Sequence, residues 1–473
     1  MVFNSYTFIL FFLFVLAVYY SPISWRNKKI FLIFSSYAFY AAWNPPFVSL
    51  LIISTLTDWI LAQRIYYATS LNRRRLFLVA SLSVNLGLLG FFKYSAFLVQ
   101  SFSDLVRPFG IMYQAPELDI ILPVGISFYT FQTLSYTIDV YRRQLKPWTS
   151  FVDYALFVTF FPQLVAGPIV RARDFLPQTL REKVANARHL AWGVSLMILG
   201  LFQKVVVADG LLAPIVEKVY DGTGIVSPLA AGIGTLAFAG QIFCDFAGYS
   251  TIAIGVAMCL GFALPDNFRF PYAAIGFSDF WRRWHISLSS WLRDYLYIGL
   301  GGNRHGAVKT FRNLTVTMLL GGLWHGASWN FVVWGALHGT YLVLERIATA
   351  LAGHWAVWRT GAGRVFLAAV TFALVCFAWV FFRANDFPKA FEIVQAGLFL
   401  LPEYETFVTT GETATVLITL AVLVTLHWRL RDTTIESAAE RLSPLLRGSL
   451  LGLMLVAVAM SPGEDRAFIY FQF

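Results

Sequence analysis

The chain has 473 residues, of which 58% are hydrophobic and only 13% are charged, and its formal net charge is +10 at pH 7. The apolar residues come in long blocks, such as 5–20 and 364–382, and about twenty apolar residues span the hydrocarbon core of a bilayer as a helix. This composition excludes a soluble globular protein and predicts an all-α polytopic membrane protein. The positive charge does not predict nucleic-acid binding, because the basic residues lie in short loops between apolar blocks.

The basic loops predict the orientation of the first half of the chain. Lys and Arg follow the first, third and fifth apolar blocks, at residues 26–29, 64–75 and 142–146. By the positive-inside rule these loops are cytoplasmic, which places the N-terminus outside. The first block has no basic residue before it and no small-residue cleavage site after it, so we expect a retained helix rather than a signal peptide. The rule assigns no orientation beyond residue 226.

The apolar segment 151–168 is too short for its place in this topology. The loop at 171–188 is also basic and therefore cytoplasmic, so the segment would have to cross the membrane twice, at about twenty residues per crossing. Pro162, Gly167 and Pro168 interrupt it. We therefore predict a re-entrant segment, which is tolerated only where protein or a water-filled cavity surrounds the broken backbone. Transporters and membrane enzymes both place such segments at their sites.

The chain shows no internal repeat, low-complexity tract or soluble domain. We predict a single membrane-embedded domain over 1–473, with about ten to twelve transmembrane or partial helices. Cys244, Cys259 and Cys376 lie in apolar segments at spacings that fit neither a disulfide framework nor a zinc site. No metal is expected.

Histidines supply the candidate chemistry. Four of the seven lie in or beside charged or interfacial loops, where solvated side chains are expected: His189, His305, His354 and His427. The other three, His285, His325 and His338, lie in apolar surroundings, where an ionisable residue indicates a function.

His285 belongs to a stretch, 280–302, with the pattern of an amphipathic helix. At 100° per residue one face is apolar and aromatic, and it contains Trp281, Trp284, Leu288, Trp291, Leu292 and Tyr295. His285 falls in the middle of this stripe. The opposite face is basic and polar, and it contains Arg282, Arg283, Ser287, Ser290, Arg293 and Asp294. We expect the basic face to lie along the cytoplasmic surface and His285 to point into the protein. A hydrogen-bonded core histidine is the structural alternative.

On one straight helix His325 and His338 would be separated by about 220° and about 20 Å, which argues against a shared metal site and weakens the case for a haem. His325 is flanked by glycines and by Trp324, Ser328 and Asn330, which can orient its ring. His338 has plainer surroundings, and we expect it to pack between helices. The sequence predicts no metal site, Cys nucleophile or phosphate-binding loop. A neutral histidine imidazole can then act as a general base, which takes the proton of a hydroxyl as it attacks an activated acyl carbonyl.

Five stretches carry a resemblance to a known family: residues 123–142, 160–172, 280–304, 321–339 and 468–473, which include the strings "WRRWH" and "LWHGA". They resemble the bacterial membrane-bound O-acyltransferase family, in the branch of alginate O-acetyltransferase membrane subunits. The resemblance extends over essentially the whole chain.

The resemblance implies a fold and a reaction. His325 matches the catalytic histidine of the family and His285 its second characteristic histidine, within a ring of helices around a central funnel and tunnel. The implied donor is cytoplasmic acetyl-CoA or another acyl thioester or acyl carrier, with no tightly bound cofactor. The acetyl group passes to a periplasmic acetyltransferase partner protein that modifies an exported polysaccharide such as alginate. The implied location is the bacterial inner membrane.

Further site residues are predicted beside His325. Trp324, Ser328 and Asn330 are expected to shape the acceptor site while His325 removes the proton of the attacking hydroxyl. Asp245 is either a structural acid or a residue of the tunnel. Arg304, with Lys309 and Arg312, can meet the phosphates of the donor, although ordinary positive-inside charge explains all three.

Two other classes of function fit the same features. A polysaccharide transporter would use re-entrant segments and buried polar residues, but inverted repeats are expected in it. A scaffold of an export complex needs the helices and not His325. Within the enzyme class, D-alanyl transfer to a cell-wall polymer is the alternative, and it would use an acyl carrier protein on the cytoplasmic face.

Overall fold

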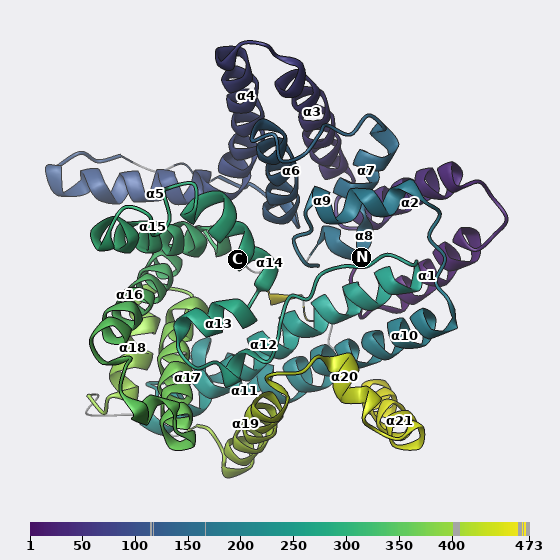
Figure 1. The fold of residues 1–473 in the computed structure, drawn as a ribbon. Helices are drawn as coiled ribbons and strands as arrows, with labels where there is room; N and C mark the ends of the chain where they lie inside the picture. The colour runs from purple at the N-terminus through teal and green to yellow at the C-terminus, as the bar shows by residue number, and fades with distance from the viewer. Residues whose placement is uncertain are drawn as a thin grey trace. The chain divides into compact units, whose positions relative to one another are not determined.

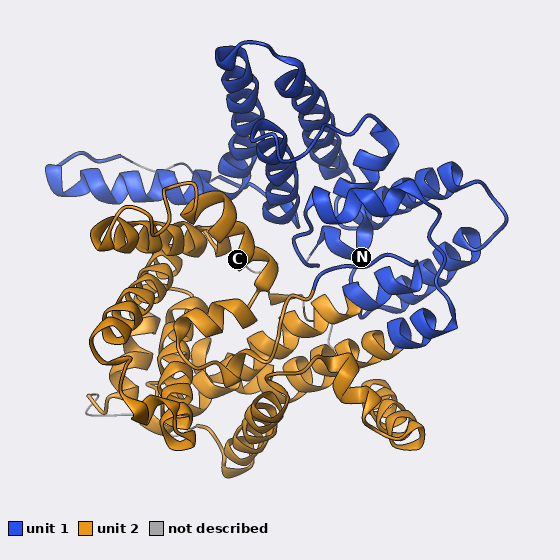
Figure 2. Cartoon of the chain, viewed as in Figure 1, with its two compact units in different colours: residues 1–194, 253–265 blue, residues 195–252, 266–473 orange. Residues whose placement is uncertain are grey.

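The computed structural model describes residues 1–113, 116, 118–165, 167–400, 407–461, 466, 468 and 469. Ala166 and residues 470–473, which belong to two of the stretches that carry the resemblance, lie outside the described residues. Every regular element of the described part is a helix (Figure 1). The chain forms two compact units, residues 1–194 with 253–265 and residues 195–252 with 266–473 (Figure 2). The single domain over 1–473 stays a prediction.

Six stretches of the described chain are long and apolar enough to cross a membrane: Pro45–Tyr67, Leu71–Phe109, Ala187–Tyr220, Pro228–Cys259, Gly361–Arg383 and Thr410–Leu430. Two shorter apolar helices are Tyr6–Tyr19 and Pro444–Met460. The all-α membrane architecture is confirmed, whereas the count of ten to twelve transmembrane or partial helices stays a prediction.

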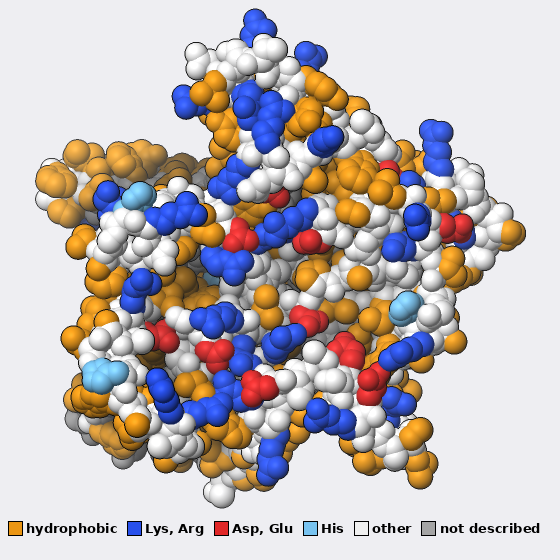
Figure 3. All heavy atoms as spheres, viewed as in Figure 1, with side chains coloured by type: hydrophobic (Ala, Val, Ile, Leu, Met, Phe, Trp, Pro, Cys, Tyr) orange, Lys and Arg blue, Asp and Glu red, His pale blue; other side chains and the backbone are white. Residues whose placement is uncertain are grey.

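Unit 1 contains the first helices of the chain: α1 (Tyr6–Tyr19), α2 (Trp25–Ala41), α3 (Val48–Tyr67), α4 (Leu71–Leu89), α5 (Ser95–Val106), α6 (Ile126–Tyr141), α7 (Phe151–Thr159), α8 (Phe161–Leu164) and α9 (Ala172–Phe175). Helices α3, α4 and α6 pack on one another (Figure 1). Their interface buries Asp58 and Asn85, with Asn85 Nδ2 donating to Asp58 Oδ2 at 2.8 Å. Basic side chains gather at the end of the α3–α4 hairpin (Figure 3), where the sequence predicts a cytoplasmic loop.

The segment 151–168 is broken, as its prolines and glycine predict. Helix α7 rises about 14 Å, too little to cross a bilayer, and a bend at Phe160 separates it from α8. The described residues from Asp153 to Val165 are all buried, so protein surrounds the broken backbone. Lys29, from a predicted cytoplasmic loop, lies near the start of α2 and forms a buried ion pair with Asp153.

Unit 2 contains α11 (Ala213–Tyr220), α13 (Phe277–Arg283), α14 (Ile286–Trp291), α15 (Ala307–His325), α16 (Trp329–Ala352), α17 (Gly361–Arg383), α18 (Phe387–Gly397), α19 (Thr410–Leu430), α20 (Ile435–Glu440) and α21 (Pro444–Met460). The unit boundaries fall within α10 (Ala187–Leu201) and α12 (Pro228–Cys259). The described residues include three π-helical stretches: η2 (Gly90–Tyr94), η5 (Phe202–Leu212) and η7 (Leu292–Tyr297).

Helices α15 and α16 form a hairpin whose backbones meet at glycines. A Cβ atom on Gly322 would lie 2.2 Å from the Phe331 carbonyl oxygen, and one on Gly335 would lie 2.4 Å from that of Met318. Small residues allow this close approach, which favours dispersion contacts between helices in a membrane. The hairpin fixes the end of α15, where His325 is the last residue.

The stretch 280–302 is not one amphipathic helix, and this prediction is wrong. Helix α13 ends at Arg283, and His285 adopts the left-handed conformation, with φ 43° and ψ 55°, before α14 begins. The left-handed conformation costs about 1–2 kcal/mol for a residue with a Cβ atom. Arg283, expected on the solvated basic face, is instead buried, and its guanidinium donates to Asp279 Oδ1 and to the Arg431 carbonyl. The expectation that His285 points into the protein is confirmed, since it is fully buried.

Candidate active site

The structure brings His285 and His325 together inside unit 2. Their ring centroids are 6.4 Å apart and the ring planes are inclined by 60°. One histidine is the residue before α14 and the other is the last residue of α15, so two helix ends converge on this point. Both side chains are buried. The pair that the sequence singled out is therefore one constellation.

Aromatic rings enclose the two imidazoles. Phe246 lies 4.7 Å from His285, and Trp334 and Phe382 lie 4.9 Å and 5.2 Å from His325, measured between ring centroids. Burial lowers the pKa of His285 to about 3, so this imidazole is neutral at physiological pH. A neutral imidazole in such surroundings can accept a proton or a hydrogen bond from a hydroxyl.

Hydrogen bonds determine which nitrogen of His285 carries the proton. Asn267 Oδ1 lies 3.0 Å from His285 Nδ1 and accepts from the Ser287 backbone N–H at 3.3 Å and from Ser287 Oγ at 2.8 Å. Because a backbone N–H can only donate, the atom of Asn267 at this position is the oxygen. His285 Nδ1 therefore donates its proton to Asn267, and the lone pair of the ring lies on Nε2.

The three residues predicted beside His325 lie in different places. Trp324 is buried beside both histidines, with ring centroids 5.7 Å from His285 and 5.1 Å from His325. Ser328 is the N-cap of α16 and accepts from the Asn330 backbone N–H at 3.2 Å. Asn330 Nδ2 donates to the Ala384 carbonyl at 2.8 Å, which ties α16 to the end of α17. Their substrate contacts stay predictions.

His338 belongs to α16 and not to the helix of His325, because the chain turns at Gly326–Ser328. Its fully buried ring packs against Trp334 at 4.6 Å and Trp281 at 5.1 Å. Neither ring nitrogen has a hydrogen-bond partner among the described residues. Its observed contacts are thus with aromatic rings, which agrees with the packing role that the sequence predicts.

Asp245 is part of a buried ion-pair cluster. Lys204 Nζ lies 2.6 Å from Asp245 Oδ1 and 2.9 Å from Asp209 Oδ1, and the Ile469 backbone N–H donates to Asp245 Oδ2 at 2.8 Å. The side chains of Lys204 and Asp245 are each 3% exposed. The sequence predicts that Asp245 is either a structural acid or a residue of the tunnel, and these contacts are those of a structural acid.

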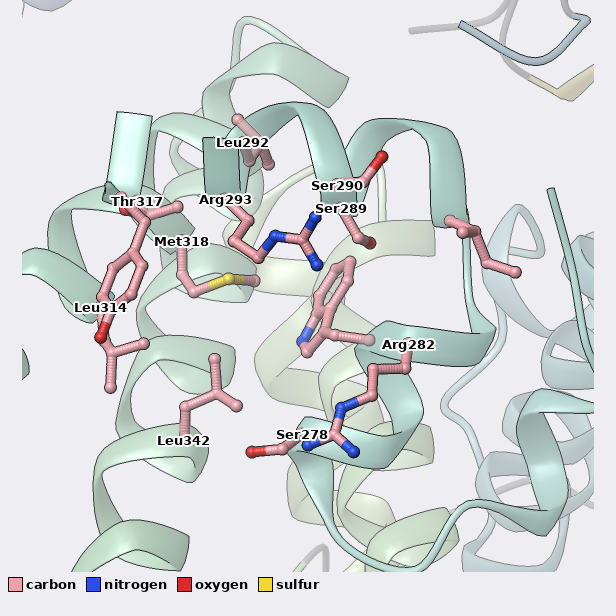
Figure 4. A pocket seen from close by; sticks show the side chains of 13 residues that line it. Ser278, Arg282, Ser289, Ser290, Leu292, Arg293, Leu314, Thr317, Met318 and Leu342 are labelled. Atoms are coloured by element: carbon pink, nitrogen blue, oxygen red, sulfur yellow. The ribbon is translucent and has the colours of Figure 1, made fainter. Parts of the chain in front are cut away.

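Unit 2 contains a cavity of about 450 Å³ (Figure 4), and neither His285 nor His325 is among the described residues that line it. Its walls come from α13 to α16, and they include Trp281, which touches His338, and Ile286, the neighbour of His285. Figure 4 shows Arg282 and Arg293 at the cavity together with Ser289 and Ser290. Arg293 also donates to Asp294 Oδ1 at 2.7 Å.

The predicted phosphate-binding residues lie elsewhere. Arg304, Lys309 and Arg312 are exposed, and none of them is among the described residues that line this cavity. Arg282 and Arg293 are exposed, as the sequence predicts for the basic face, and they also line the cavity.

One of the four histidines expected in solvent is buried. His427 is 3% exposed within α19, and its Nδ1 accepts from the Tyr272 backbone N–H at 3.2 Å. The turn Pro271–Ala273 packs on α19 and provides this partner. The other three, His189, His305 and His354, are exposed as predicted.

The sequence did not point to Asn267 or Lys204 as partners of the candidate residues. Asn267 lies in an irregular stretch before α13, and Lys204 lies in the π-helical stretch η5. Lys204 could have been singled out from the sequence, because it is a charged residue within an apolar block. Within the described chain, no group of three or more His, Cys, Asp or Glu side chains is arranged to hold a metal ion.

Comparison with known proteins identifies the family. The model of the membrane-bound O-acyltransferase family matches residues 139–383, a region that contains both His285 and His325. The chain belongs to this family. It is therefore a multi-pass membrane O-acyltransferase, and the resemblance based on the "WRRWH" and "LWHGA" strings is confirmed.

Similar curated proteins include two kinds of O-acetyltransferase. A probable alginate O-acetylase from Azotobacter vinelandii is 41% identical over 84% of this chain and 78% of the relative. A peptidoglycan O-acetyltransferase from Helicobacter pylori is 37% identical over 78% of this chain and 73% of the relative. A teichoic acid D-alanyltransferase from Streptococcus thermophilus is 31% identical over 47% of this chain and 56% of the relative.

Proposed function

We propose that this O-acyltransferase moves an acetyl group from a cytoplasmic thioester, such as acetyl-CoA, across the bacterial inner membrane for O-acetylation of an exported polysaccharide such as alginate. The observation that carries the proposal is the buried pair of His285 and His325, 6.4 Å apart within aromatic walls. The relatives named for alginate and peptidoglycan add support, since in both the acceptor is a glycan hydroxyl.

In the proposed reaction His325 is the general base. Its imidazole takes the proton of the acceptor hydroxyl while the hydroxyl oxygen bonds to the thioester carbonyl carbon. The carbon–sulfur bond then breaks, and the leaving thiolate receives the proton from the imidazolium. General base catalysis of this type contributes typically about 10²- to 10⁴-fold. His285 assists through Nε2, which can accept a hydrogen bond from the acceptor, and Trp324 separates the reacting groups from water.

The donor occupies the cavity of Figure 4 in this proposal. Coenzyme A and acyl carriers both present phosphates on a narrow, partly apolar chain, and the cavity combines two guanidinium groups, Arg282 and Arg293, with apolar walls from Leu314, Met318 and Leu342. A periplasmic acetyltransferase partner protein then moves the acetyl group onward: the ester formed on the first acceptor hydroxyl is cleaved as a new ester forms on a polymer hydroxyl, and the first hydroxyl regains its proton.

The test measures esters on the exported glycan. Cells carry the wild type, His325→Ala, His285→Ala or the exposed control His354→Ala, with membrane levels checked by immunoblot. Mild base releases the ester-linked acid from isolated glycan for mass spectrometry. We expect acetate in the wild type and the control, and its loss in His325→Ala at a normal membrane level.

Other outcomes point elsewhere. Acetylation that survives in His325→Ala would favour a scaffold or transporter over a catalyst. Release of D-alanine instead of acetate, together with binding of an acyl carrier protein to the membrane protein, would favour D-alanyl transfer.

A further inference from the structure

Asn267 lies where it can control the imidazole of His285. It is 1% exposed, and its segment pairs with the bend at His285 through two backbone hydrogen bonds, Ile286 N–H to Asn267 O and Arg269 N–H to Arg283 O, each 2.9 Å long. The left-handed backbone of His285 is thus held against Asn267 from both sides of the bend.

The side chain of Asn267 is itself held in one orientation. Its Oδ1 accepts from Ser287 N–H and Oγ–H, and its Nδ2 donates to Ser250 Oγ at 3.1 Å. Rotating the amide by 180° would place an NH₂ group against the Ser287 backbone N–H, which can only donate. The oxygen therefore faces His285 Nδ1 whichever way the Ser287 hydroxyl turns.

We propose that Asn267 is a positioning residue for acyl transfer: it accepts the Nδ1 proton of His285 and so holds the ring in the tautomer whose Nε2 accepts from the acceptor hydroxyl. This inference rests on the proposed function, in which His285 assists His325. A neutral imidazole without a partner at Nδ1 can place its proton on either nitrogen, and only one tautomer has an acceptor at Nε2.

The first experiment reads the tautomer directly. Full-length protein labelled with ¹⁵N-histidine is reconstituted in lipid, and the ring signals of His285 are assigned as those missing from His285→Gln. We expect a protonated Nδ1 and an unprotonated Nε2 in the wild type and in Ser250→Ala, which removes only the hydrogen bond at the other end of Asn267. A protonated Nε2 in the wild type would overturn the proposal without any variant.

The second experiment links the tautomer to transfer. Asn267→Leu removes the acceptor with little change in size, whereas Asn267→Asp keeps it. We expect Asn267→Leu to lose the protonated Nδ1 signal and to lower glycan acetylation on the order of 10- to 100-fold at equal membrane level, which is the effect of removing the hydrogen-bond partner of a metal-binding histidine. Asn267→Asp should restore both readouts.

The outcomes separate this inference from the proposed function. Normal acetylation in Asn267→Leu, or lost acetylation with the tautomer unchanged, would refute the positioning role. Normal acetylation in His285→Gln would instead refute the role of His285 in the proposed reaction, whatever its tautomer.

Discussion

The buried cluster of Lys204, Asp209 and Asp245 provides a test with a defined order of effects. It holds one positive and two negative groups, so its formal net charge is −1. Lys204→Met leaves both carboxylates without their cation, whereas Asp245→Asn leaves the neutral pair of Lys204 and Asp209, 2.9 Å apart. Removing one partner of a buried ion pair costs about 3–5 kcal/mol, because the remaining charge is uncompensated. Losing one charge-assisted hydrogen bond costs about 1–3 kcal/mol.

We therefore expect Lys204→Met to destabilise the protein more than Asp245→Asn. In Asp245→Asn the side-chain oxygen can still accept from the Ile469 backbone N–H. The assay is thermal unfolding of each purified variant in detergent, followed by glycan acetylation at equal membrane level. The neutral triple variant, Lys204→Met with Asp209→Asn and Asp245→Asn, should recover much of the stability lost in Lys204→Met.

Equal destabilisation by the two single substitutions would refute the charge argument. Lost acetylation in Asp245→Asn with unchanged stability would show a substrate role for Asp245.

Substitutions at three positions test helix packing and the pH dependence of stability. Gly335→Ala should push α15 and α16 apart and lower the stability of the protein by about 1–3 kcal/mol, because the new Cβ would lie 2.4 Å from the Met318 carbonyl oxygen. The measurement is unfolding of this variant beside that of Gly232→Ala, whose Cβ would meet nothing within 4 Å. His338→Phe should keep glycan acetylation, because a ring still fills the site. His338→Ala should lower the stability of the protein by about 2–4 kcal/mol, because it leaves a cavity among the rings. Loss of acetylation in a stable His338→Phe would show that the imidazole acts chemically. Burial lowers the pKa of His285 to about 3. Below about pH 6.5 the unfolded chain therefore binds a proton at this imidazole and the folded chain does not. The stability of the folded protein should fall as the pH falls from 6.5 towards 3. His285→Gln should make this fall shallower in denaturant titrations, and an unchanged slope would contradict the assignment.

Properties that depend on local composition could be predicted from the sequence. The apolar blocks determine the membrane architecture, and prolines and a glycine break the segment 151–168, because these effects need no distant partner. The burial of His285 also followed from its apolar neighbours, although the helix expected around it does not exist. The helix period assumes a regular backbone, and the left-handed bend at His285 interrupts it.

Tertiary structure alone decided which buried groups meet. His285 and His325 become one pair only because the ends of α14 and α15 converge, and His338 is separated from His325 by the turn at Gly326–Ser328. Asn267 meets His285, and Lys204 meets Asp245, through contacts between residues far apart in the chain. A buried polar group must find a partner, which is a local requirement that the sequence reveals. Which partner it finds depends on how the helices pack, and no local pattern contains that information.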